Sequence, residues 1–288
     1  MAFRLDPDQL VSAGLTRLLT DAIGDARDAL FDTNLNRDER IHRTRRRIKR
    51  ARSLIRVLRP LFGRGYRDEV RRLRDASRLL STTRDADVVA ATAATLVDSA
   101  GAHDRELLDV LIETLNARAE RAHAQETPID AAVALLDEAR TAASFLASNF
   151  EGRTLLREAV AETYACECRA MEKAAESRAA ERFHDWRKLA KHRWHLLRVS
   201  EGRLNKAKPK AIARIDDLGE TLGLVCDCTL LSELLLDNPS LAGTGRATDH
   251  ILAILDVQRA ELEDRALKLA RRVYKASPKK YGKSLKLK

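Results

Sequence analysis

The sequence predicts an all-α protein made of two antiparallel helical bundles. Residues that favour helices dominate the 288-residue chain, whereas aromatic residues make up only 4% and prolines number 6. Apolar residues recur at helical spacing along most of the chain. A basic helix led by a histidine occurs twice, because His184 follows His42 by 142 residues and cations align around both. This repeat predicts two bundles related by internal duplication and a pseudo-twofold axis.

The first half of the chain contains helical segments separated by helix breakers. Pro7 marks the start of the first segment, Pro60 ends the basic helix, and Gly101 separates two later segments. These signals predict helices over residues 8–34, 37–59, 66–81, 84–100, 104–123 and 128–148. The segment from Asn149 to Gly152 is the best candidate for a domain boundary.

The second half repeats this plan less regularly. Helices are predicted over residues 153–178, 180–200, 210–222, 226–236 and 249–275, with a lysine-rich loop before the third of them. The tail holds lysines and little apolar surface, so it is predicted to be disordered. The expected organisation is a first bundle over residues 1–150, a second over 151–276 and a disordered basic tail over 277–288.

Positive charge is segregated along the chain. The net charge is +10, but residues 37–78 hold 17 basic against 5 acidic residues, and residues 182–214 hold 11 against 2. Residues 268–288 add 9 basic residues and no acidic one. A solvated surface ordinarily mixes signs, so this pattern favours an anionic partner. The sequence has neither an apolar run that could span a membrane nor an apolar signal region, so we expect a cytoplasmic protein.

The cations of the two basic helices fall on helical stripes. Three- and four-residue steps place the first set on one face, with Arg46 beside it: His42, Arg45, Lys49, Arg52 and Arg56. The second copy supplies His184, Arg187, Lys188, Lys191 and Arg198, with His195 in reach. The segments after the two basic helices add Arg71, Arg74 and Arg78 in the first half, and Lys206, Lys208, Lys210 and Arg214 in the second. Together these residues predict a central basic groove or pore.

Phosphate is the anionic group that suits these side chains best. Arg offers forked donors to phosphate oxygens, and Lys adds a point charge. The chain has no glycine-rich phosphate loop, so side chains rather than backbone amides would bind the ligand. A stripe of this length suits a long ligand, and inorganic polyphosphate, nucleic acid and an anionic membrane all qualify on charge. Scarce aromatic residues disfavour single-stranded nucleic acid, and the need for apolar sides inside the bundles disfavours a membrane.

These motifs resemble the CHAD domain, the conserved histidine α-helical domain, over about residues 8–275. The first copy matches through its run of cations and through Arg84-Asp85-Ala86-Asp87. The second copy departs at Cys226 and Thr229, where the family pattern would have Arg and Asp. This departure favours a structural role for Asp85 and Asp227, such as helix capping.

The resemblance implies two helical bundles with pseudo-twofold symmetry and a central basic surface that binds inorganic polyphosphate. It also implies localisation to polyphosphate granules, as is often found in bacterial or archaeal members. Members of the family can be fused to a triphosphate-tunnel catalytic domain, and nothing in this chain resembles that strand-rich barrel. We therefore expect a stand-alone binding module without enzymatic activity and without a cofactor.

Several alternatives remain open. A nucleic-acid-binding protein would use the same basic surface, and tight DNA binding that polyphosphate displaces poorly would distinguish it. A metal-dependent polyphosphatase would release phosphate, but Asp85 and Asp87 are a weak metal motif. His42 and His184 are expected to donate to phosphate or to be structural, rather than to act as acid–base groups. The cysteines form two C-x-C pairs whose members point about 200° apart on a helix, so reduced structural thiols are expected.

Overall fold

The computed structural model describes residues 3–97, 101–147 and 150–287 of the chain. Within these ranges the prediction of an all-α fold is confirmed, since the one strand-like pairing is an isolated bridge between Leu204 and Leu287. None of the described helices combines the length and the apolar character that crossing a bilayer requires. In chain order the helices are α1 (Val11–Ala29), α2 (Arg37–Val57), α3 (Arg59–Phe62), η1 (Gly63–Gly65), α4 (Tyr66–Leu79), α5 (Thr82–Leu96), α6 (Ala102–Ala124), α7 (Ile129–Ser144), α8 (Gly152–Ser177), α9 (Ala180–Val199), α10 (Pro209–Asp237), η3 (Pro239–Ala242), α11 (Gly245–Val273) and α12 (Pro278–Ser284).

Local sequence signals set the start of α2 and the side that it buries. The Asn36 side chain accepts a hydrogen bond from the amide of Glu39 at 2.9 Å, and the Glu39 carboxylate accepts one from the amide of Asn36 at 3.1 Å. This capping box fixes the first turn of the helix. Ile41, Ile48 and Ile55 recur every seven residues and are all buried. The cations of α2 are therefore left on the other sides of the helix.

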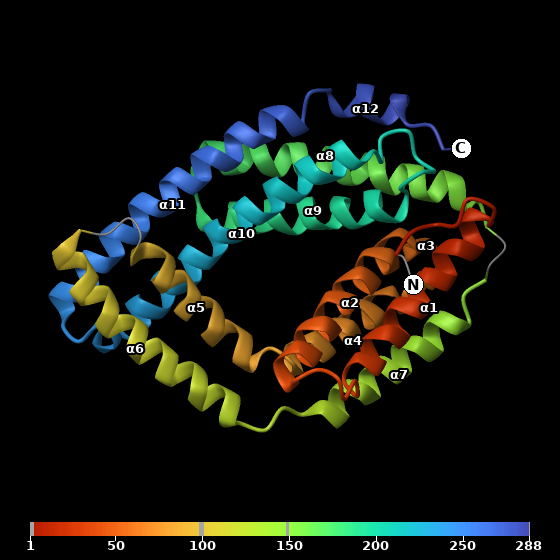
Figure 1. Ribbon diagram of the computed structural model, residues 1–288. Coiled ribbons are helices and arrows are strands. Elements are labelled where there is room, and N and C mark those ends of the chain that lie inside the picture. The colour runs from red at the N-terminus through yellow and green to blue at the C-terminus, as the bar shows by residue number, and fades with distance from the viewer. Residues whose placement is uncertain (1–2, 98–100, 148–149, 288) are drawn as a thin grey trace.

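The helices are arranged as an elongated ring (Figure 1). On one side α1, α2, α4 and α7 pack together, and on the other side α8, α9, α10 and α11 pack in succession. At one end of the ring, the α5–α6 pair packs against α10, α11 and η3. At the other end, α2 contacts α8 and α9, and α1 contacts α8. The two basic helices α2 and α9 are therefore direct neighbours.

The hydrophobic core does not divide at the predicted boundary near residue 150. One cluster of buried residues joins α1 and α2 to α8 and α9, for example through Leu15, Leu156 and Leu196. A second cluster joins α5 and α6 to α10 and α11, for example through Leu111 and Leu231. The predicted units 1–150 and 151–276 thus share cores instead of each burying its own apolar stripe. The reason is that helices of each half complete the packing of the other half.

Helix α10 is continuous where the sequence predicts a break between residues 222 and 226. Gly219 and Gly223 lie inside this helix and are buried. A Cβ atom on Gly219 would lie 2.9 Å from Cε of Lys191, and one on Gly223 would lie 3.2 Å from Nη2 of Arg187. These glycines therefore let side chains of α9 lie across α10, and they act as packing positions rather than as helix breakers.

The tail over residues 277–288 was predicted to be disordered, but the structure orders residues 277–287. Ser277 caps the short helix α12, which packs on α8. Tyr281 stacks on Tyr164 with ring centroids 3.7 Å apart, and Leu285 is buried as well. The two apolar side chains lie four residues apart and so share one helical face, which anchors the segment to the core.

The bounds of the helices fit an offset of 142 residues between the halves. This offset maps α2 onto residues 179–199, which is nearly the span of α9. It maps α4 and α5 together onto residues 208–238, which is nearly the span of α10. The internal duplication and the pseudo-twofold axis themselves stay predictions.

Candidate anion-binding site

The cations on one side of α2 have no acidic partners. Toward α1, Arg43 and Arg47 pair with Asp32 and Asp25 at 3.0 and 3.4 Å. Arg45 instead donates to the carbonyl oxygen of Ser77 at 2.7 Å, so its charge stays uncompensated. Among the described residues, no carboxylate lies within ion-pair distance of the other predicted site residues of α2, namely His42, Arg46, Lys49, Arg52 and Arg56.

The corresponding cations of α9 are paired with acids of α10. Lys191 Nζ lies 3.0 Å from Asp216 Oδ1, and Arg187 Nη1 lies 3.7 Å from Asp227 Oδ1. Both basic side chains are half-buried, and they lie over the two glycines of α10. On the outer side of α9, Lys188 pairs with Asp185 at 3.1 Å. Much of the charge on α9 is therefore compensated within the protein.

The charges of α2, α5 and α9 converge at Lys49. Although Lys49 is accessible to solvent, neighbouring protein partly encloses its ammonium group. Its pKa is lowered to about 8, first by burial and then by the positive charges of Arg84, Arg45, Arg187 and Lys191. Two of these charges come from α9 and one from α5. The structure therefore brings the two basic helices to one place, as a central basic surface requires.

The same electrostatic pressure acts on His42. Its pKa is lowered by burial and then by the cations Arg84, Arg46, Lys49 and Arg45. In the free protein this histidine is thus mostly neutral near pH 7. We call the group of converging side chains the central cluster, and it consists of His42, Arg45, Lys49, Arg84, Arg187 and Lys191.

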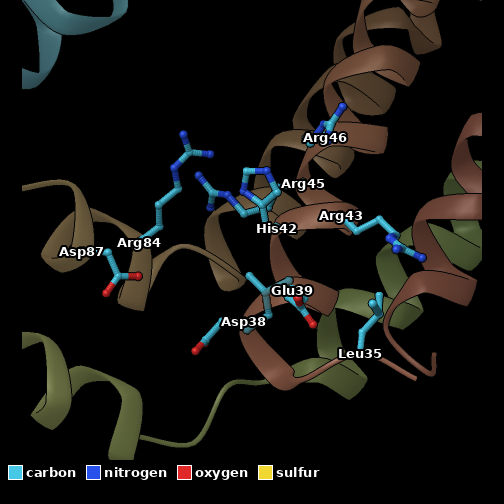
Figure 2. A pocket seen from close by; sticks show the side chains of 10 residues that line it. Leu35, Asp38, Glu39, His42, Arg43, Arg45, Arg46, Arg84 and Asp87 are labelled. Atoms are coloured by element: carbon cyan, nitrogen blue, oxygen red, sulfur yellow. The ribbon is translucent and has the colours of Figure 1, made fainter. Parts of the chain in front are cut away.

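A pocket of about 450 Å³ opens beside the central cluster. Figure 2 shows Arg84 reaching from α5 toward His42 and Arg45, which line the pocket from α2. The acidic residues at the pocket, Asp38 and Asp87, are held by a residue of α6. His123 Nδ1 lies 3.1 Å from Asp38, and His123 Nε2 lies 2.8 Å from Asp87. Its hydrogen bond with Asp87 is the largest influence that raises the pKa of His123.

Arg84 is a residue of the central cluster that the sequence-based site prediction omits. The search compared cations across the repeat, and the position that matches Arg84 in the second half is Cys226. The signal was present in the Arg84-Asp85 pair, but without a counterpart it did not mark a binding residue. Tertiary structure supplies the missing information, because α5 lies across from α2 and places the Arg84 charge next to Lys49 and Arg45.

Two predicted groups lie apart from the central cluster. On α4, Arg71 and Arg78 pair with acids one helical turn away at 3.4 and 3.9 Å, and Arg74 also lies near one of those acids. Arg74 is close enough to α2 that its charge contributes to lowering the pKa of Arg52, after burial and Arg56. The second group lies past the end of α9 and in the first turns of α10: Lys206, Lys208, Lys210 and Arg214.

The remaining predicted residues of α9 occupy different surroundings. His184 is exposed, and its pKa is lowered by burial and by Lys188 and Arg187. The Arg198 guanidinium lies 5.8 Å from the ring centroid of Trp194. His195, expected within reach of the basic face, is buried beside Trp194 and Phe3. Burial is the main cause that lowers the pKa of His195 to about 3, so this residue is a neutral part of the core.

The structure gives no support to a metal site in the part of the chain that it describes. No group of three or more His, Cys, Asp or Glu side chains there is arranged to hold a metal ion. Asp87 is engaged by His123, while Asp85 is exposed. The four cysteines are free thiols, with Cys168 and Cys228 buried. The cluster can therefore offer a ligand positive charge and N–H donors from guanidinium, ammonium and imidazole groups.

Comparison with known proteins places this arrangement in context. The sequence model of the CHAD domain family matches residues 17–236. The crystal structure of the CHAD domain from the plant Ricinus communis is similar with a TM-score of 0.64 and 17% identity, covering 100% of this chain and 98% of that chain. PptA from Streptomyces chartreusis is similar with a TM-score of 0.65 and 16% identity, covering 92% and 98%. At these identities the structures show a shared fold alone. No curated protein matches the sequence.

Proposed function

The chain belongs to the CHAD domain family, and from this premise we propose that it binds inorganic polyphosphate at the central cluster. The observation that carries the proposal is the convergence of cations from α2, α5 and α9, several without acidic partners. Such a cluster costs free energy in the empty protein because like charges repel. A polyanion removes this cost and gains charge-assisted hydrogen bonds, so the surface is suited to a ligand with regularly spaced phosphates.

The aromatic side chains next to the cluster favour polyphosphate over single-stranded nucleic acid. Lys191 Nζ lies 5.4 Å from the ring centroid of Trp194, and Arg198 also lies over this ring. The Phe3 ring lies 5.1 Å from the guanidinium of Arg50. These rings are engaged by the protein's own cations, so they are poor platforms for stacking bases. Recognition would then rest on phosphate charge alone.

We further propose binding without catalysis, with association to polyphosphate granules as the cellular consequence. The groups of the central cluster are donors and cations, which bind phosphate oxygens without supplying a nucleophile. Purified protein incubated with polyphosphate and Mg²⁺ is expected to release no orthophosphate. Phosphate release that co-purifies with the protein and disappears on neutralising the cluster would contradict this part of the proposal.

A competition titration tests the choice of ligand. Labelled long-chain polyphosphate is bound at physiological salt and then challenged with equal phosphate equivalents of single-stranded and duplex DNA. We expect DNA to displace little of the label. Ready displacement would favour the alternative of a nucleic-acid-binding protein that uses the same surface.

A set of variants tests the choice of site. Reversing Arg45, Lys49, Arg187 and Lys191 to Glu is expected to abolish polyphosphate binding while the helical circular dichroism signal stays. The matched control reverses three exposed arginines of α6, Arg105, Arg118 and Arg121, and is expected to bind like the parent. Unchanged binding by the first variant would show that the cluster is not the site.

A further inference from the structure

The segment after α11 presents an unusual concentration of unpaired positive charge. Residues 271–287 contain seven cations and no acidic residue. All seven are exposed, and none has a carboxylate within ion-pair distance among the residues that the structure describes. They are Arg271, Arg272, Lys275, Lys279, Lys280, Lys283 and Lys286. An exposed segment that served solubility alone would normally mix both signs.

These cations are carried on an anchored element. Tyr281 and Leu285 hold α12 against the core, and a Cβ atom on Gly282 would lie 3.5 Å from Ala161 of α8. Lys279 and Lys283 lie two residues before and after Tyr281, so they project from the opposite side of the helix. The charge is therefore fixed in place, and a ligand would not have to order a flexible tail on binding.

The anchored segment adjoins another group of lysines. The amide of Asn205 donates to the carbonyl oxygen of Lys286 at 3.0 Å, and the amide of Lys286 donates to Oδ1 of Asn205 at 2.9 Å. The Asn205 side chain also donates to the carbonyl oxygen of Ser284 at 2.8 Å. These bonds join the loop before α10 to the end of the chain. We call the combined surface the C-terminal patch, made of Lys206, Lys208, Lys210, Lys279, Lys280, Lys283 and Lys286.

The C-terminal patch is separate from the central cluster. Helix α12 packs on α8, and α8 in turn packs on α9, whose opposite neighbours are α2 and α10. Figure 1 shows α12 on the outer edge of the ring, on the far side of α8 from α2. The lysines of the loop lie beyond the C-terminal end of α9, at least nine residues from Lys191 along the chain. One short ligand therefore cannot occupy both surfaces at once.

The chemistry of the patch favours a phosphate chain over a membrane. Within residues 203–210 and 274–287 no large apolar side chain is exposed, so the patch offers nothing to insert into a lipid layer. Lysines are compact point charges that suit a flexible anion with many equivalent oxygens. Resting on the proposed function, we infer that the C-terminal patch binds a second segment of polyphosphate. One molecule of the protein then bridges two chains, or two parts of one chain, which would condense polyphosphate.

Stoichiometry with a short polyphosphate tests the two surfaces separately. By isothermal titration calorimetry, the parent is expected to bind two short chains per molecule. The patch variant, with Lys280, Lys283 and Lys286 changed to Glu, should bind one. The cluster variant, with Lys49 and Arg84 changed to Glu, should also bind one, at the patch. The α6 control with Arg105, Arg118 and Arg121 changed to Glu should keep two.

A two-chain capture assay then tests bridging. Immobilised long-chain polyphosphate is loaded with protein and exposed to fluorescent polyphosphate, with the mass of the free protein checked by light scattering. The parent and the α6 control should capture the second chain, and the patch variant should capture at least tenfold less. Equal capture by parent and patch variant, or one bound chain in the parent, would overturn the inference.

The outcomes also separate this inference from the proposed function. If the cluster variant keeps the parent's stoichiometry while the patch variant loses all binding, the central site is wrong and the patch is the binding surface. If the patch variant loses binding to duplex DNA or to anionic vesicles while its stoichiometry for polyphosphate stays at two, the patch serves another anion and the inference fails.

Discussion

The two basic helices, α2 and α9, carry matching cations in different electrostatic surroundings. Lys49 of α2 has no acidic partner within ion-pair distance in the described structure, whereas its counterpart Lys191 lies 3.0 Å from Asp216. Arg45 donates to a backbone carbonyl, whereas its counterpart Arg187 faces Asp227. The repeat therefore preserves the positions of the cations but not their charge balance.

The difference originates in the neighbouring helices. At the offset of 142 residues, Asp216 of α10 corresponds to Arg74 of α4, so an acid in one half stands where the other half has a cation. Asp227 corresponds to Asp85, next to which stands the additional cation Arg84. The first half thus supplies most of the free positive charge, and the second half contributes cations that are already compensated. We expect ligand binding to depend on the two halves unequally.

The largest expected effect comes from neutralising cations without acidic partners. Changing Lys49 and Arg84 to Gln should weaken polyphosphate binding about 100-fold, at about 1.5 kcal/mol for each charge-assisted contact. Changing Arg187 and Lys191 to Gln should weaken it about tenfold or less, because these cations already interact with acids. Fluorescence anisotropy with labelled polyphosphate measures both affinities. Equal losses in the two variants would break the proposed asymmetry.

Removing the acids of the second half should make the halves more alike. Changing Asp216 and Asp227 to Asn frees Lys191 and Arg187, so polyphosphate affinity is expected to rise about tenfold. The slope of log affinity against log salt should also steepen by up to about two, one for each freed cation. A salt titration of the binding constant checks both effects. Changing the exposed Asp109 and Asp249 to Asn gives a control with the same change in net charge.

The pH dependence of binding should report on Lys49. Its pKa is about 8 in the free protein, and a bound polyanion favours the charged form and raises this pKa. Affinity should therefore hold below about pH 8 and fall as the pH rises toward the pKa of the bound state, by at most about tenfold per unit. Lys49→Arg, which stays charged, should flatten this profile, whereas Lys191→Arg should not. A profile that Lys49→Arg leaves unchanged would assign the titration to another group.

The smallest expected effect concerns the stability of the free protein. Lys49→Gln removes repulsion and should raise the free energy of unfolding, whereas Lys191→Gln removes the partner of Asp216 and should lower it. Each change is expected to be about 0.5 kcal/mol, since both side chains are partly exposed. Thermal unfolding without ligand compares the two variants. The comparison depends on the opposite signs, and shifts in the same direction would contradict it.

Much of the fold followed from the sequence, including the family resemblance, which is confirmed. The basic helix was predicted over residues 37–59 and spans Arg37–Val57, because its capping residues and isoleucine spacing are local signals. The second basic helix, predicted over 180–200, spans Ala180–Val199. By contrast, the glycines of α10 were interpreted as a break, since their role depends on side chains from α9. The order of α12 depends on Tyr164, more than 100 residues away in sequence.

The sequence by itself determined where the helices lie, which of their faces carry cations and which family the chain belongs to. These properties depend on the residue type and on spacing within one or two helical turns. Tertiary structure alone decided which cations meet, which of them are neutralised and which belong to another surface. Arg84 joins the cluster and Lys206 joins the patch because charges interact through space, whatever their separation along the chain.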